Sequence, residues 1–138
     1  MRGLFVLFWA GMIFVFTCTA SFNGLMDTGE IRFYINPTPH FSELLAPLPL
    51  QLSGGFLIQK FGHAFAFFIL TALLQIAFQS KKLVFSLATF YAALTEFLQL
   101  FFTRDGRLFD VGIDTIGILL ALGIGRLFMT HPSRETNF

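Results

Sequence analysis

The sequence predicts an all-helical integral membrane protein, a bundle of four transmembrane helices with one long extracytoplasmic loop. Three observations support this fold class. The composition is 55% hydrophobic and only 12% charged, whereas about a quarter of the residues of an ordinary globular protein are charged. Four apolar runs follow one another along the chain, and a proline-rich stretch separates the first two. At 138 residues, the chain forms a single domain over residues 1–138.

The four apolar runs cover residues 4–22, 61–79, 83–102 and 111–129. A helix needs about 20 such residues to cross the hydrocarbon core of a bilayer. Each run must be helical, because lipid offers the backbone no hydrogen-bond partners. The first run is longer than the apolar core of a cleaved signal peptide, roughly 7–15 residues, so we interpret it as an uncleaved span.

The connectors differ greatly in length. Residues 23–60 hold four of the five prolines, and Asn36-Pro37-Thr38-Pro39 cannot be regular helix. We expect residues 41–52 to lie along the membrane interface or over the bundle. Ser80-Lys81-Lys82 is short enough to be a tight turn, which makes the second and third helices an antiparallel hairpin. Residues 103–110 form another short connector, and residues 131–138 form a polar tail.

The distribution of lysine and arginine indicates the orientation. With a cytoplasmic N-terminus, the inside holds Arg2, Lys81, Lys82, Arg126 and Arg134, and the outside holds Arg32, Lys60, Arg104 and Arg107. Five positive residues against four favour a multi-pass membrane protein with both termini inside. In either orientation, the start of the second helix, the end of the third and the start of the fourth lie at the same membrane face.

Ionisable and amide side chains gather at these three helix ends. A charge inside the bilayer costs about 2.5–3.5 kcal/mol, so it should face the bundle and have a partner. We therefore expect one polar layer that binds a ligand. Its members are Lys60, His63, Glu96, Gln99, Arg104, Arg107, Asp110 and Asp114. His63, Glu96 and Asp114 are the candidate catalytic residues within it.

The residues of this layer have structural as well as functional interpretations. His63 is either an interfacial histidine bonded to Glu96 or water, or a group that transfers protons or contacts substrate. Glu96 could be held protonated or paired with Lys60 or an arginine.

The remaining layer residues also have alternatives. Arg104 and Arg107 could be solvated loop charges, or could grip a phosphate or carboxylate together with Lys60. Asp110 could cap the fourth helix, whereas Asp114 lies too far inside and needs a partner.

Small residues predict where helices pack. A stripe on the third helix indicates a helix–helix interface: Ser86, Thr89, Ala93, Glu96 and Leu100. A second row continues the acidic face of the fourth helix: Asp110, Asp114, Gly117, Ala121 and Gly125. Gly117 is interpreted as a packing residue with no chemical role.

Composition and spacing also exclude some functions. The net charge of +1 excludes a broad basic face for nucleic acid. Cys18 is the only cysteine, so no disulfide forms within the chain. The layer contains one histidine and no His/Cys pair with ligand spacing, so we predict no metal and no cofactor, with a Ca²⁺ or Mg²⁺ bridge among Glu96, Asp110 and Asp114 left open.

The ordered motifs of the layer resemble the VanZ-like membrane proteins over roughly residues 4–129. The matching elements are Lys60-x-x-His63, Glu96-x-x-Gln99, an arginine at 104 or 107, and Asp110-x-x-x-Asp114-Thr115-x-Gly117. Gln59, where the family usually has Asp, removes a possible partner of Lys60. The resemblance implies a place in the bacterial cell membrane and a link to low-level teicoplanin resistance, with no established reaction. A polar layer at the outer face, as the orientation predicts, fits that setting.

Three functions are compatible with these observations. The preferred one is a non-enzymatic envelope protein that binds a lipid-linked precursor or the glycopeptide itself. The second is a membrane-embedded enzyme acting on an envelope lipid, with His63 and Glu96 as general acid and base. The third is a structural or accessory membrane protein without chemistry. The bilayer is the expected partner in each case, and a homo-oligomer stays open.

Overall fold

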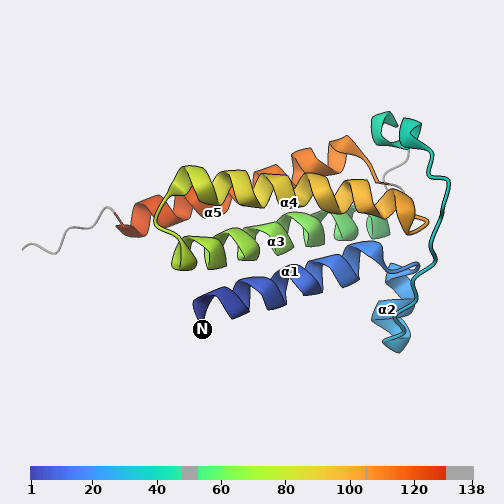
Figure 1. The fold of residues 1–138 in the computed structure, drawn as a ribbon, viewed down its shortest axis with the longest axis horizontal. Helices are drawn as coiled ribbons and strands as arrows, with labels where there is room; N and C mark the ends of the chain where they lie inside the picture. The colour runs from blue at the N-terminus through green and yellow to red at the C-terminus, as the bar shows by residue number, and fades with distance from the viewer. Residues whose placement is uncertain (48–52, 105, 130–138) are drawn as a thin grey trace, which may run out of the picture.

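Helices make up all the regular structure that the computed structural model describes, which covers residues 1–47, 53–104 and 106–129. The elements are α1 (Arg2–Cys18), α2 (Phe22–Thr28), a 3₁₀ helix η1 (Phe41–Leu45), α3 (Gly54–Ala77), α4 (Lys81–Phe101) and α5 (Leu108–Met129). The four long helices α1, α3, α4 and α5 run side by side along the long axis of the molecule (Figure 1).

Three of these helices, α3, α4 and α5, are long and apolar enough to cross a membrane. The fourth, α1, is also apolar but has only 17 residues, about 25 Å of helix against a hydrocarbon core of about 30 Å. The prediction of an all-helical membrane protein is confirmed. Four full spans stay a prediction.

The first helix ends at Cys18 and not at residue 22 because the next residues bond elsewhere. Thr19 has extended backbone angles, and the Ala20 amide donates to the Arg32 carbonyl at 2.8 Å. Ser21 then caps α2, its hydroxyl accepting from the Gly24 amide at 3.0 Å. A local backbone pairing with the long connector therefore interrupts an apolar run that looks continuous in sequence.

Helix α3 begins earlier than the predicted span. The Ser53 hydroxyl accepts from the Phe56 amide at 3.2 Å, so the helix starts at Gly54 rather than near residue 61. Lys60 thus lies on a helix turn rather than in a loop. The Ser80 hydroxyl caps α4 by accepting from the Leu83 amide at 3.3 Å, and the predicted α3–α4 hairpin is confirmed.

The long connector crosses the end of the bundle. The Asn36 amide donates to the Phe101 carbonyl at 2.7 Å, and the Phe41 ring stacks on Phe97 with centroids 6.0 Å apart. Element η1 thus lies over the end of α4 (Figure 1). This agrees with the expectation that the segment 41–52 lies over the bundle, for the part of it that η1 covers. Residues 48–52, residue 105 and the predicted polar tail at 131–138 fall outside the described residues.

Close contact between α3 and α5 confirms the predicted small-residue row. A Cβ atom added at Gly117 would overlap the backbone carbonyl of Ala64, so only glycine allows this approach. The predicted stripe on α4 is wrong in part, since Ser86 and Ala93 are exposed. The buried face instead passes through Val84, Ala88, Ala92, Thr95, Glu96, Gln99 and Leu100.

The error on α4 has a simple cause. Ala88 and Ala92 lie one position before Thr89 and Ala93, and their small side chains equally permit close helix packing. Two neighbouring stripes therefore compete in sequence, and the packing of α3 and α5 decides between them. The three helix ends predicted to share a membrane face do lie together, opposite the N-terminus and the α3–α4 turn (Figure 1).

Candidate functional site

A polar cavity of about 300 Å³ lies at the shared helix ends. It is lined by Ala20, Phe56, Gln59, Lys60, His63, Gln99, Thr103, Arg104, Arg107 and Asp110. We call it the polar pocket. Six of the eight residues predicted from sequence line it, and the other two, Glu96 and Asp114, lie behind His63. Residues from three helices and two connectors thus meet at one place.

Lys60 pairs with Asp110 across helices α3 and α5. The Nζ atom of Lys60 lies 2.5 Å from Oδ2 of Asp110, and both side chains are largely buried, 13% and 3% exposed. Lys60 also sits 5.0 Å from the ring centroid of Phe56. The partner of Lys60 is therefore Asp110, not Glu96 as one interpretation held, and the Asp110 carboxylate contacts a lysine on another helix.

Glu96 holds the loop between α4 and α5. Its Oε1 accepts from Gln99 Nε2 at 2.7 Å, and its Oε2 accepts from the backbone amide of Arg107 at 3.0 Å. Gly106 packs against the same helix so closely that an added Cβ would overlap the Glu96 carbonyl oxygen. Sequence reasoning missed Gly106, because its role depends on where the loop lies.

The loop folds back through one unusual residue. Thr103 has a φ of 55°, in the left-handed region that few non-glycine residues adopt. This angle ends α4 and allows the Arg104 amide to donate to the Gln99 carbonyl at 3.0 Å. The turn directs the chain so that both Arg104 and Arg107 line the polar pocket. Both arginines therefore stay candidates for the single arginine of the family pattern.

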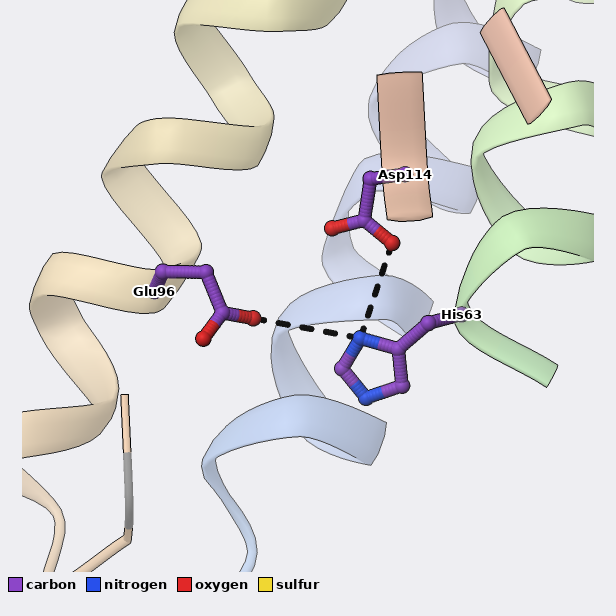
Figure 2. A group of neighbouring side chains, drawn as sticks. All are labelled: His63, Glu96 and Asp114. Carbon is purple, nitrogen blue, oxygen red and sulfur yellow. Dashed lines mark ion pairs between the residues drawn. The ribbon is translucent and has the colours of Figure 1, made fainter. Parts of the chain in front are cut away.

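His63, Glu96 and Asp114 converge from α3, α4 and α5 (Figure 2). The Nδ1 atom of His63 lies 3.7 Å from Oδ1 of Asp114 and 3.9 Å from Oε1 of Glu96. Both carboxylate residues are fully buried. Figure 2 shows the two carboxylates directed toward the same edge of the imidazole ring.

An apolar groove adjoins the polar pocket. It has a volume of about 260 Å³ and lies between α1 and α3, with a contribution from α2. Its lining is Trp9, Met12, Ile13, Phe16, Thr17, Met26, Gln59, Gly62, His63, Phe65, Ala66 and Phe67. Gln59 and His63 line both spaces. The sequence held no signal for this groove, since its residues read as ordinary lipid-facing side chains.

The fold and the site together define a class, a helical membrane protein with a buried polar site at one end of its bundle. Comparison with known proteins places it further: residues 3–129 match the VanZ/LLP1 family, and the chain belongs to that family. It is 38% identical over 126 residues to the protein of Bacillus subtilis (strain 168) described as "Uncharacterized membrane protein YwnJ", covering 90% of this chain and 89% of that protein. No solved structure matches.

Proposed function

We propose that this protein binds an anionic amphiphile of the bacterial cell envelope, such as a lipid-linked precursor, at the outer face of the cell membrane. One observation carries the proposal. The polar pocket and the apolar groove meet at Gln59 and His63. A molecule with a charged head and an apolar chain can occupy both spaces at once.

The polar pocket suits an anionic head. Lys60, Arg104 and Arg107 line it, and arginine presents donors in a planar fork that matches phosphate or carboxylate oxygens. Lys60 is already paired with Asp110, so we assign the main anion contact to Arg104, which lines the same pocket. The volume of about 300 Å³ is at the lower end for ligand pockets. It accommodates the phosphate part of a lipid-linked precursor and is too small for a whole glycopeptide.

The apolar groove suits the chain of the same ligand. It runs between helices α1 and α3, and Trp9 is anchored there by its indole N–H, which donates to the Ala66 carbonyl at 2.9 Å. Trp9 is also the only tryptophan in the chain. Its fluorescence therefore reports on this groove without interference from another indole.

The test is quenching of Trp9 fluorescence by brominated lipids added to the full-length protein in detergent. We expect saturable quenching by brominated phosphatidic acid and weaker binding of brominated phosphatidylcholine. Arg104→Gln should weaken binding of the anionic lipid about tenfold, since a hydrogen bond to a charged group contributes about 1.5–3 kcal/mol.

The matched control is Lys82→Gln, which removes a positive charge at the opposite end of the bundle. Equal binding by Arg104→Gln and Lys82→Gln would contradict the proposal. Teicoplanin added as a competitor separates the two ligand classes: displacement of the brominated lipid shows that the glycopeptide shares the site. Teicoplanin susceptibility and protein level, read side by side in Arg104→Gln cells, connect binding to resistance.

The outer-face location is tested separately, in a variant whose Cys18 is replaced by alanine. Single cysteines at Ser42 and Ser80 lie at opposite ends of the bundle, and both positions are exposed. An impermeant thiol reagent added to intact cells should label the cysteine at 42 and not the one at 80. Labelling at 80 alone would reverse the orientation.

A membrane-embedded enzyme is the second candidate, and the observation that favours it is the position of His63. Its ring lines the polar pocket while two buried carboxylates lie within 4 Å of Nδ1, as expected for an oriented general base. If the protein is an enzyme, Glu96→Gln should abolish turnover of a lipid-linked precursor while protein abundance stays unchanged.

A further inference from the structure

Buried side chains that make no hydrogen bond form a cluster behind the polar pocket. Within the described parts of the chain, His63 Nδ1 and both carboxylate oxygens of Asp114 are buried and have no hydrogen-bond partner. Buried polar groups are almost always hydrogen-bonded. One ligand atom from each of His63, Glu96 and Asp114 lies within 4.8 Å of the others, so a single species between them would contact all three.

With Glu96 and Asp114 both ionised, the charges of the cluster do not balance. Lys60 and Asp110 neutralise each other as a pair, which leaves the carboxylates of Glu96 and Asp114 around one imidazole. A protonated His63 would supply one positive charge against two negative ones. It also lies 3.7 and 3.9 Å from the nearest carboxylate oxygens, too far for a hydrogen bond. An imidazolium alone therefore satisfies neither the charge nor the contacts.

We propose that His63, Glu96 and Asp114 bind a divalent transition-metal ion such as zinc. One ligand atom from each residue lies within 4.8 Å of the others. Tetrahedral metal–ligand bonds of about 2.0–2.2 Å hold ligand atoms roughly 3.3–3.6 Å apart, so side-chain rotations that move these atoms by about 1 Å would close the site. Two carboxylates and a dication give a neutral unit, which suits burial inside a membrane bundle.

The chemistry of the ligands selects among ions. Imidazole nitrogen suits zinc and related transition metals, whereas Mg²⁺ and Ca²⁺ prefer oxygen alone. Three protein ligands leave an open coordination position, as in sites that bind exchangeable water or substrate. His63 borders the polar pocket, so the proposed metal site lies directly behind that pocket. Gln99 and the Arg107 amide hold the Glu96 carboxylate, the kind of outer contact that orients a metal ligand.

This inference reverses the prediction that the chain has no metal site. That prediction relied on ligand spacing within the sequence, and here each ligand comes from a different helix. The spacings of 33 and 18 residues between the three ligands match no short motif. The site becomes visible only when α3, α4 and α5 are packed.

The experiment uses full-length protein in detergent, stripped with a chelator and titrated calorimetrically with Zn²⁺, Mn²⁺, Mg²⁺ and Ca²⁺. We expect one equivalent of Zn²⁺ per chain, with weaker binding of Mg²⁺ and Ca²⁺. Asp114→Asn and His63→Ala should each lower zinc affinity at least about 100-fold. His40→Ala is the control, because it removes an exposed histidine of the connector and should leave zinc binding unchanged.

A second measurement covers variants that fold poorly. Zinc should raise the unfolding temperature of the wild type and of His40→Ala, and leave that of folded Asp114→Asn unchanged. The absence of stoichiometric zinc binding by the wild type would overturn the proposal, as would equal affinity in Asp114→Asn or tighter binding of Mg²⁺ or Ca²⁺. Quenching of Trp9 by brominated lipid is also measured in chelator-stripped protein. It shows whether the protein binds lipid without metal, so that the two proposals can fail separately.

Discussion

The two halves of the helical bundle use their buried positions in opposite ways. The half that carries the N-terminus and the α3–α4 turn is filled by apolar and small side chains, among them Leu70, Leu74, Val84, Ala88 and Ala121. The other half buries Lys60, His63, Glu96, Asp110 and Asp114. We call them the packing half and the site half.

Their polar groups differ as well. In the packing half, the Thr71 hydroxyl donates to the Phe67 carbonyl at 2.8 Å, and Gln75 Nε2 donates to the Ala121 carbonyl at 3.0 Å. In the site half, the Asp114 carboxylate makes no hydrogen bond to any described residue. Among the described residues, Gln75 Oε1 in the packing half also lacks a partner, but the site half gathers such atoms in one ionisable cluster. Mutations in the packing half should therefore remove packing contacts, whereas mutations in the site half should remove charges.

The largest effect is expected where the packing half begins. Gly117→Ala places a Cβ onto the Ala64 carbonyl, a backbone atom that cannot rotate away, so α3 and α5 must separate. We expect a loss of about 3 kcal/mol or more in unfolding free energy, measured by thermal unfolding in detergent and by the yield of monodisperse protein.

Gly123→Ala is the matched control on the same helix. A Cβ added there meets no atom within 4 Å, so alanine should be neutral or stabilise by up to about 1 kcal/mol through helix propensity. Equal destabilisation by the two changes would show that helix α5 does not depend on contact at Gly117.

An intermediate effect is expected from the Lys60–Asp110 ion pair, which joins helices α3 and α5. Lys60→Met leaves the Asp110 carboxylate buried without its lysine, at a cost of about 3 kcal/mol. Lys60→Met combined with Asp110→Asn should restore most of this stability, because the unpaired charge is gone. Unfolding of both single variants and the double variant gives the coupling energy, and simple additivity would count against the pair.

The smallest effect on stability is expected at Asp114. Asp114→Asn removes a buried charge without removing a hydrogen bond to a described residue, so the metal-free protein should change by about 1 kcal/mol or less. The same variant should lose zinc affinity. A severe loss of folded protein would instead make Asp114 a structural residue and favour the accessory-protein interpretation.

Much of the site was predictable from single residues. A charge within an apolar helix must face the interior, which is why Glu96 and Asp114 could be placed from sequence. The partner of each charge could not be predicted in this way. From sequence, the candidate partner of Lys60 was Glu96, because the family's Asp at position 59 is replaced by Gln, yet its partner is Asp110 on another helix. The hydropathy pattern shows which face of a helix is buried, but it does not fix how two helices are aligned along their axes. It therefore cannot say which turn of α3 faces which turn of α5.

The sequence by itself determined the class of the protein and the polar layer, because these follow from the cost of placing charge and backbone in lipid. It also determined the small-residue row of α5, because small side chains let helices pack closely. Only the tertiary structure decided that α1 stops at Cys18, that Gly106 and Arg107 fold back onto Glu96, and that a groove beside α1 opens into the polar pocket. It also brought His63, Glu96 and Asp114 to one point. Each of these depends on contacts between segments far apart in the chain, whose geometry is set by packing and not by local composition.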